Sequence, residues 1–223
     1  MKKIAVLIAL GFILYSCRDK CELPFDSYIF YFENPQPLND SELNSIPTKF
    51  IGEYINSDAV VLKIKKNAIT SENSFKFKFP KNQMDSLKTE FNFADGKCIS
   101  KLDNSVLDYK IVGDSIELFS KKIDTIFIFS DTKKAKRING VLVLNVKNAK
   151  NWEVRLVNLK KNKLEIKYLY AESDLRRMDS ITKIHSKSID STTFLINPTR
   201  REFSKFLQLK DFGYVQVYEK KSN

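Results

Sequence analysis

The strongest constraint on the fold is an alternation of side chains with a period of two residues. In Ser74–Phe79, three phenylalanines stand at every second position, and lysines stand between them. Successive side chains of a β-strand point to opposite faces of a sheet, so this segment is typical of a strand with one buried and one solvated face. The chain is therefore expected to build its core from β-strands.

Further strand-like segments follow one another from Phe50 to Tyr218, separated by residues that favour turns. The expected strands are Phe50–Ile55, Val60–Ile64, Phe75–Phe79, Phe91–Phe93, Val106–Val112, Ser115–Phe119, Thr125–Phe129, Val141–Val146, Trp152–Leu159, Leu164–Leu169, Thr192–Ile196 and Tyr214–Tyr218. Asp95-Gly96, Gly113-Asp114 and Asn139-Gly140 lie between such segments and supply the positive φ that tight hairpins need. This spacing predicts a mostly β protein, an antiparallel meander that forms a barrel or a sandwich.

Two of these segments lack the alternation. Val141–Leu144 and Ile126–Phe129 are continuous apolar runs. Strands that are covered on both faces have this character, so we expect both runs to be buried on two sides.

Only a few short helices are expected. Thr199–Glu202 follows Pro198 and has the sequence of a capping box, after which Phe203, Phe206 and Leu207 share one helical face. This pattern predicts a helix near the C-terminus that ends close to Phe212-Gly213. Two further short helices are expected at 81–87 and 174–180.

The N-terminus carries a separate signal. Lys2 and Lys3 precede the eleven apolar residues of Ile4–Leu14. A helix of that length covers roughly 16 Å, while the hydrocarbon core of a bilayer is about 30 Å thick. The segment is therefore too short to span a membrane and predicts a secretory signal that is removed.

The end of this segment, Leu14-Tyr15-Ser16-Cys17, resembles the lipobox of bacterial lipoproteins. The resemblance implies that residues 1–16 are removed and that the Cys17 thiol receives a diacylglyceryl group, usually with a further acyl chain such as palmitate. Arg18 stands where an inner-membrane retention signal would place Asp, which favours the outer membrane. The alternative is an ordinary signal peptide cut near Ser16, with Cys17 left for a disulfide.

The whole chain is also similar to the small envelope lipoproteins common in Bacteroidota, through the lipobox, the proline-marked segment after it and the Phe50–Tyr54 strand. This resemblance implies no activity. Residues 17–45 contain Pro24, Pro35 and Pro37 and predict a tether, part of which packs on the body as an edge strand through its aromatic cluster. Residues 46–223 are expected to form a single β-rich domain.

Two cysteines remain once Cys17 is lipidated. Cys21 and Cys98 form an even pair in an oxidising compartment, and a disulfide between them would join the tether to the domain. The alternative is two unrelated thiols, with Cys98 facing the core of a strand.

Few residues offer enzyme chemistry. His185 is the only histidine, so a site with two histidine ligands is impossible, and the six glycines form neither a nucleophile elbow nor a phosphate-binding loop. We therefore expect no catalytic residues, no metal and no cofactor. Acidic residues in or beside strands leave one alternative open, a hydrolase that uses a carboxylate pair. They are Glu53, Asp58, Glu117, Asp124 and Glu165, and most alternate with apolar residues as solvent-facing positions do.

The charge is strongly positive, +11 for the whole chain. Removal of residues 1–16 leaves 36 basic against 27 acidic side chains, a net charge of +9. The basic residues form four short clusters, Lys133, Lys134, Lys136 and Arg137; Lys160, Lys161, Lys163 and Lys167; Arg176 and Arg177; and Arg200 and Arg201. The partners that such clusters fit in an envelope are anionic lipid, acidic polysaccharide or an acidic protein surface, not nucleic acid. The alternative is that they are solvated outer faces of strands.

Three aromatic residues could bind a sugar. Trp152, Tyr168 and Tyr170 could form a platform, although Trp152 opens an alternating strand and is more typical of a core residue there. The function expected is that of a membrane-anchored envelope lipoprotein whose β domain binds or scaffolds without catalysis. The alternatives are the hydrolase of an envelope polymer and a lipocalin-like carrier of a small apolar ligand.

Replacement of Cys17 tests the anchor. The Cys17→Ser variant has no thiol for the diacylglyceryl group, so we expect it to leave the membrane fraction when cells are fractionated, while the wild-type protein stays there. A variant that remains in the membrane at the wild-type level would contradict the lipid assignment.

Overall fold

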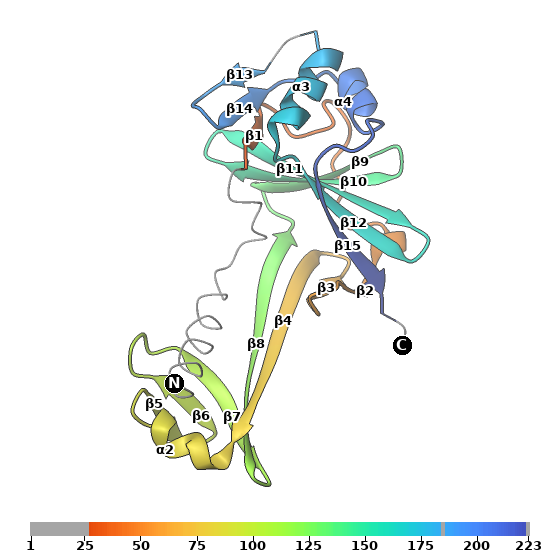
Figure 1. Cartoon of the computed structure of the whole chain (residues 1–223). Helices are drawn as coiled ribbons and strands as arrows, with labels where there is room; N and C mark the ends of the chain where they lie inside the picture. The colour runs from red at the N-terminus through yellow and green to blue at the C-terminus, as the bar shows by residue number, and fades with distance from the viewer. Residues whose placement is uncertain (1–26, 184–185, 222–223) are drawn as a thin grey trace. The chain divides into compact units, whose positions relative to one another are not determined.

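A computed structural model describes residues 27–183 and 186–221 (Figure 1). The chain divides into two compact units, which we call the small unit, Ser74–Lys122, and the large unit, made of the described residues on either side of it. Both boundaries fall inside long strands, β4 (Ala68–Pro80) and β8 (Ser115–Ile128), so each of these strands contributes to both units. Each unit has hydrophobic core residues of its own, and the single domain expected over 46–223 stays a prediction.

The large unit contains most of the strands and two α-helices. Besides parts of β4 and β8, its strands are β1 (Ile29–Phe32), β2 (Gly52–Ile55), β3 (Val61–Ile64), β9 (Lys133–Ile138), β10 (Val141–Asn148), β11 (Asn151–Lys160), β12 (Lys163–Tyr168), β13 (Lys187–Ser188), β14 (Thr193–Ile196) and β15 (Tyr214–Lys220). The helices are η1 (Thr48–Phe50), α3 (Glu172–Ile181) and α4 (Arg200–Phe206). The prediction of a mostly β fold with short helices, one of them near the C-terminus, is confirmed.

The strand order in the large unit is β13-β14-β1-β11-β12-β15-β2-β3-β4-β8, and β10 pairs with both β11 and β9. Strands β1 and β14 run parallel, whereas β1–β11, β9–β10–β11–β12–β15–β2–β3–β4 and β13–β14 pair antiparallel. The sheet has free ends and is therefore open, with a hydrophobic core on each of its two faces.

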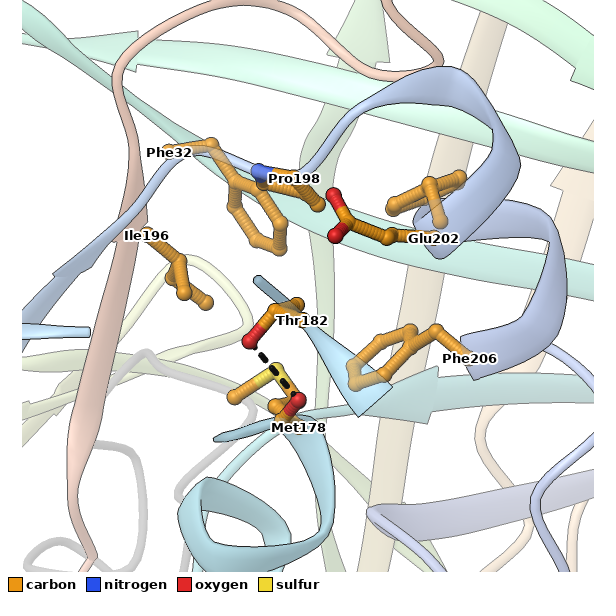
Figure 2. Close-up of a pocket in the computed structure, with 8 residues that line it drawn as sticks. Phe32, Met178, Thr182, Ile196, Pro198, Glu202 and Phe206 are labelled. Carbon is orange, nitrogen blue, oxygen red and sulfur yellow. Dashed lines mark hydrogen bonds between the residues drawn. The ribbon is translucent and has the colours of Figure 1, made fainter. Parts of the chain in front are cut away.

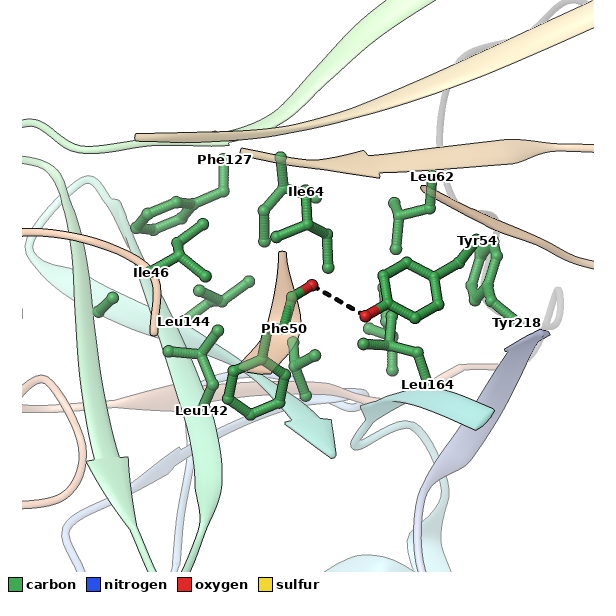
Figure 3. Packing of buried hydrophobic residues seen from close by; sticks show 14 of the residues in the cluster. Ile46, Phe50, Tyr54, Leu62, Ile64, Phe127, Leu142, Leu144, Leu164 and Tyr218 are labelled. Atoms are coloured by element: carbon green, nitrogen blue, oxygen red, sulfur yellow. Dashed lines mark hydrogen bonds between the residues drawn. The ribbon is translucent and has the colours of Figure 1, made fainter. Parts of the chain in front are cut away.

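The first of these cores, the inner core, lies between β2, β3, β10, β12 and β15 (Figure 3). Its largest fully buried members, Phe50, Tyr54 and Phe127, have no exposed surface. The Tyr54 hydroxyl donates to the Phe50 carbonyl at 3.0 Å, which gives the buried phenol a hydrogen-bond partner. The remaining buried members are Ile46, Leu62, Ile64, Ile69, Ala135, Leu142, Leu144, Val157, Leu164, Ile166, Tyr168 and Tyr218.

The second core, the outer core, lies on the opposite face of β10 and β11, where β1, α3 and α4 pack (Figure 1). Along β10, Leu142 and Leu144 point into the inner core, and Val143 points into the outer core. The expected two-sided burial of Val141–Leu144 is therefore confirmed.

The same expectation is wrong for Ile126–Phe129. Phe127 is fully buried in the inner core, but the neighbouring Ile128 is 48% exposed. This end of β8 has a core on one face only, so a run of apolar residues was a poor guide to its surroundings.

The capping box of α4 is formed as predicted. The Glu202 amide donates to the Thr199 hydroxyl at 3.3 Å, and the Thr199 amide donates to the Glu202 carboxylate at 2.8 Å. The helix ends earlier than expected, at Phe206. Phe212 still packs on Phe206, with ring centroids 4.7 Å apart, and the positive φ of Gly213 turns the chain into β15.

The small unit is a five-stranded sheet with one covered face. From one edge, its order is the end of β4, then β8, β7 (Val106–Val112), β6 (Lys97–Ser100) and β5 (Phe91–Ala94). The short helices η2 (Lys81–Gln83) and α2 (Met84–Leu87) follow β4, as predicted. Met84, Leu87 and the three phenylalanines of β4 pack into the core of this unit. The alternation of Ser74–Phe79 is thus confirmed, with Lys76 and Lys78 exposed.

Part of the expected tether belongs to the large unit. β1 lies between β14 and β11 rather than at an edge of the sheet, and Phe30 and Phe32 are buried in the outer core. The aromatic residues of this segment explain the difference, because their burial outweighs the entropy of leaving the segment unfolded. The earlier residues of the tether, 17–26, lie outside the described residues.

A buried polar clamp holds the chain that follows β1. The Asn145 side chain has no exposed surface, and it accepts from the Gln36 amide at 2.6 Å and donates to the Gln36 carbonyl at 2.8 Å. The Lys136 ammonium donates to the carbonyls of Pro35 and Pro37 at 3.1 and 3.0 Å. Burial lowers the pKa of Lys136. The clamp satisfies backbone groups that no strand pairs.

Within the part of the chain that the structure describes, no helix has the length and apolar character needed to cross a bilayer.

Asn145→Ala removes both hydrogen bonds to the Gln36 backbone and leaves its amide and carbonyl buried. Each buried group without a partner costs roughly 1–3 kcal/mol, so we expect the free energy of unfolding to fall by about 2–4 kcal/mol in urea titrations. The matched control is Asn158→Ala in β11, whose side chain is partly exposed; it should change stability by no more than about 0.5 kcal/mol. Equal effects of the two variants would show that the clamp adds no stability.

Candidate functional site

The open face of the small unit gathers lysines from four strands. We call it the lysine face and define it by Lys76 and Lys78 of β4, Lys97 of β6, Lys110 of β7 and Lys121 of β8, together with the acidic residues Asp108 and Glu117. The period of two along β4 and β8 puts Lys78 on the face of Lys76 and Lys121 on the face of Glu117. Three observations place the other residues on one face. Lys97 stands opposite Asp108 in the β6–β7 register, Lys110 stands opposite Glu117 in the β7–β8 register, and the Lys76 ammonium lies beside Glu117.

The lysine face arises because successive side chains of each strand point to opposite faces of the sheet. In β8, Ile116 and Leu118 point into the core of the small unit, so Glu117 and Phe119 point the other way. In β6, Cys98 is buried in the same core and the flanking Lys97 is exposed. Each strand therefore gives its apolar residues to one side and its lysines to the other.

Glu117 is the centre of the charge arrangement. Its Oε2 lies 2.9 Å from the Lys76 ammonium and 3.3 Å from the Lys110 ammonium. The Glu117 side chain is only 8% exposed, whereas the Lys76 and Lys110 side chains are 59% and 57% exposed. The ion pairs with Lys76 and Lys110 lower the pKa of Glu117 against its partial desolvation. Glu117 is thus an ionised carboxylate beneath two lysines.

The lysine face keeps an excess of positive charge. Its five lysines and two carboxylates have a formal net charge of +3. Lys97 forms an ion pair with Asp108. Apolar side chains lie between the charges, with Val106 and Val112 exposed and Ile99 and Phe119 half-buried. A flat surface of this kind can bind an extended anionic chain, because lysines supply point charges and the apolar groups supply contact area.

The basic clusters read from the sequence have other roles. Lys136 belongs to the buried clamp, and the Arg177 guanidinium donates to the carbonyls of Lys210 and Asp211. Arg200 forms an ion pair with Asp40, and Lys134 forms one with Glu42 at 2.6 Å. These basic groups contact other segments of the large unit.

Other cluster members lie in short pairs at the surface. Arg176 pairs with Glu172 one helical turn earlier, at 3.2 Å. In the β11–β12 hairpin, Lys160 lies 3.6 Å from Glu165, and Lys163 lies 3.3 Å from Glu219. Exposed pairs of this kind contribute little to stability. The Lys160 and Lys163 side chains are 69% and 62% exposed, which agrees with the alternative that they are solvated.

The lysine face was missed because its members are far apart in the sequence. Only Lys76 and Lys78 were recognised as one side of a strand. Single lysines at alternating positions of later strands, Lys97 and Lys110 among them, were the available signal. The basic clusters predicted from the sequence are runs of neighbouring charges. In a strand such runs do not form one surface, because adjacent residues point to opposite faces.

The three aromatic residues considered for sugar binding are packed. Trp152 is 7% exposed in the outer core, and the Lys134 and Lys147 ammoniums lie 5.8 and 5.7 Å from its ring centroid. Tyr168 is buried in the inner core, and Tyr170 packs edge-on against Tyr214 at 5.9 Å. None of the three is an open platform.

The acidic residues considered for catalysis lie mostly beside lysines. Glu53 is 3.6 Å from Lys63, and Glu165 is 3.6 Å from Lys160. Asp58 is exposed in a turn, where its amide donates to the Asn56 side chain at 3.0 Å. Asp124 is a half-buried residue of β8. Over the described ranges, no group of three or more histidine, cysteine or acidic residues is arranged to hold a metal.

Two pockets in the described part of the large unit are small or open. The first lies between β14, α3 and α4 and is lined by apolar residues such as Phe32, Met178 and Phe206 (Figure 2). Its volume is about 10 Å³, near the limit for one water molecule. The second is an open hollow of about 300 Å³ beside the ion pair of Lys134 and Glu42.

Cys98 is the one predicted site residue that the structure describes. Its side chain is 1% exposed in the core of the small unit, and burial raises the pKa of its thiol to about 11. The Cys98 side chain thus points from β6 into the core of the small unit. Cys17 and Cys21 lie outside the described residues, as does His185, so the lipidation and the disulfide stay predictions.

Comparison of the chain with protein-family models, with curated proteins and with solved structures finds no significant match.

The Glu117 ion pairs predict a pH dependence of stability. Because the pKa of Glu117 is lowered in the folded protein, the pairs stabilise it above the ordinary glutamate pKa of 4.5, and this stability is lost as the pH falls through the folded pKa. Glu117→Gln removes the titrating group. We expect its urea midpoint, followed by circular dichroism, to fall less steeply than that of the wild type below pH 4.5.

Glu90→Gln is the control for this measurement, because Glu90 is an exposed acidic residue of the same unit. It should keep the wild-type slope. If Glu117→Gln also kept that slope, Glu117 would not be the ionised centre of the face.

Proposed function

We propose that this protein is an envelope lipoprotein, anchored in the outer membrane through a lipid on Cys17, whose β-rich body binds an acidic polysaccharide through the lysine face without catalysis. The observation that carries the proposal is the gathering of five lysines from four strands on one open sheet face. The lipobox supports the anchor, and Arg18 after the cysteine supports the outer membrane.

The shape of the lysine face favours an extended ligand. Neighbouring strands of a sheet lie about 4.8 Å apart, so the three steps from β4 to β6 spread the lysines over about 14 Å. A polymer with carboxylate or phosphate groups along its length could meet several lysines at once, and the sum of weak contacts would give binding.

The state of the acidic residues supports a binding role over a hydrolase. A glycosidase needs a general acid whose pKa is raised, usually by burial in apolar surroundings. Glu117, the most buried acidic residue of the lysine face, instead has a lowered pKa beside two lysines. An acid of this kind holds its proton poorly and cannot serve as that donor.

The packing of the large unit supports a binding surface over a carrier with an internal cavity. A lipocalin-like carrier holds its ligand inside the sheet. The corresponding space here is filled by Phe50, Tyr54 and Phe127, which have no exposed surface (Figure 3). A ligand would therefore bind at the surface.

Removal of lysines from the face tests the proposal. In Lys76→Gln/Lys97→Gln/Lys110→Gln, three positive charges are lost where the polymer would bind. With about 1 kcal/mol for each lysine near an anionic surface, we expect binding to polygalacturonate to weaken on the order of 100-fold at low salt. The measurement is titration calorimetry with the purified protein, repeated at higher salt, where wild-type binding should also weaken.

Lys160→Gln/Lys161→Gln/Lys163→Gln is the matched control, since it removes the same charge from the exposed β11–β12 hairpin. It should bind nearly as well as the wild type. Equal losses in the two triple variants would mean that net charge, not the lysine face, causes binding. Binding to vesicles of phosphatidylglycerol but not to polygalacturonate would replace the polysaccharide by a lipid surface.

A further inference from the structure

The distance from the lipid to the body is limited by the sequence. This argument rests on the proposed lipidation of Cys17. Eleven peptide units join Cys17 to Tyr28, the residue before β1, and a fully extended chain advances at most about 3.6 Å per residue. Tyr28 therefore lies within about 40 Å of the acylated cysteine, whatever path the chain takes between them.

The start of β1 is joined to two other segments of the large unit. The Tyr28 amide donates to the Tyr170 carbonyl at 2.7 Å, and the Ile29 amide donates to the Thr192 carbonyl at 2.8 Å. Because β1 and β14 run parallel, the turn between β13 and β14 lies at the same end of the sheet as the start of β1 (Figure 1). The point where the tether enters the body is thus bordered by this turn.

Two exposed isoleucines stand at this end. Ile29 is 42% exposed and Ile189 is 54% exposed. Both are neighbours of Thr193, since Ile29 stands beside it in the β1–β14 register and the Ile189 amide donates to its carbonyl at 2.8 Å. Lys187, two residues before Ile189, is exposed as well. Large apolar side chains beside a lysine are typical of surfaces that meet the headgroup region of a membrane.

The acidic residue of the turn is engaged locally. The Asp190 carboxylate accepts from the amides of Thr192 and Thr193 at 2.9 and 2.8 Å. These hydrogen bonds hold it against its own backbone, where it fixes the shape of the turn. The turn therefore presents Ile189 on a defined support.

We propose that the end of the large unit formed by Ile29, Lys187 and Ile189 rests on the phospholipid surface to which Cys17 is anchored, with the two isoleucines at the boundary between headgroups and acyl chains. A weak contact is enough, because the anchor makes it an intramolecular one at high effective concentration. The contact gives the body a preferred orientation on the membrane, instead of free rotation about the tether.

Tryptophan fluorescence in vesicles tests this orientation. The lipidated full chain, extracted in detergent, is reconstituted into phosphatidylethanolamine–phosphatidylglycerol vesicles with or without a phosphatidylcholine brominated along its acyl chains. Ile189→Trp places a probe in the proposed contact. Asn162→Trp is the matched control in the β11–β12 turn, about 25 Å from Tyr170 along β12. The buried Trp152 contributes equally to both and is subtracted with the wild-type signal.

The expected result is a loss of the added fluorescence in brominated vesicles for Ile189→Trp, with a shift of its emission to shorter wavelength, and no loss for Asn162→Trp. Ser191→Trp, in the same exposed turn, serves as a second probe if Ile189→Trp does not fold by circular dichroism. Absence of quenching at residue 189, or at residue 191 when that probe is used, overturns the inference. Equal quenching at the turn probe and at residue 162 overturns it too.

Flotation of the same vesicles separates this outcome from failure of the anchor. If the wild-type protein does not float with vesicles, the lipidation of Cys17 is wrong and the inference falls with it. If the protein floats and the turn probe is not quenched, the anchor stands and only the proposed contact is wrong.

Discussion

Strands β10 and β11 are covered on both faces, and the rest of the large unit is arranged around that pair. Leu142, Leu144 and Val157 point into the inner core, while Val143 and Val154 point into the outer core. Loss of either core would expose one side of the pair. The curved sheet on one side and β1, α3 and α4 on the other are therefore coupled through two strands.

Burial on both faces has a consequence for polar groups. The chain between β1 and η1 forms no strand and has one isolated bridge, between Leu43 and Ala135, so most of its backbone needs other hydrogen bonds. Asn145, the polar residue within an apolar strand, supplies two of them to Gln36, and Lys136 supplies two more to Pro35 and Pro37. Asn145, a polar residue in an apolar strand, thus fixes the position of the chain at Gln36.

The small unit uses the opposite arrangement. Its sheet has a core on one face only, and the other face carries the lysines. Such a face remains solvated, because lysine ammoniums resist dehydration and Glu117 joins two of them at close range. The same alternation that turns one face of this sheet into a core turns the other face into the charged surface that we propose as a binding site.

Most strands, the hairpin turns, the capping box of α4 and the division of Phe75 and Lys76 between two faces were readable from the sequence, because each depends on residues that are neighbours in the chain. Strands β6, β9 and β13 were not predicted. The exposed Ile128, the burial of Phe30 and Phe32 in a central strand, and the division into two units were not. Each depends on which segments meet across long intervals of sequence.

The candidate site shows the same limit. The sequence by itself determined a segment at Cys17 that resembles a lipobox, a scarcity of histidine and glycine, and an excess of lysine. Only the tertiary structure decided which lysines act together, by placing Lys76, Lys97 and Lys110 on one sheet face while Lys136 was buried. The reason is that strand pairing, a long-range interaction, sets the distances between charges in space.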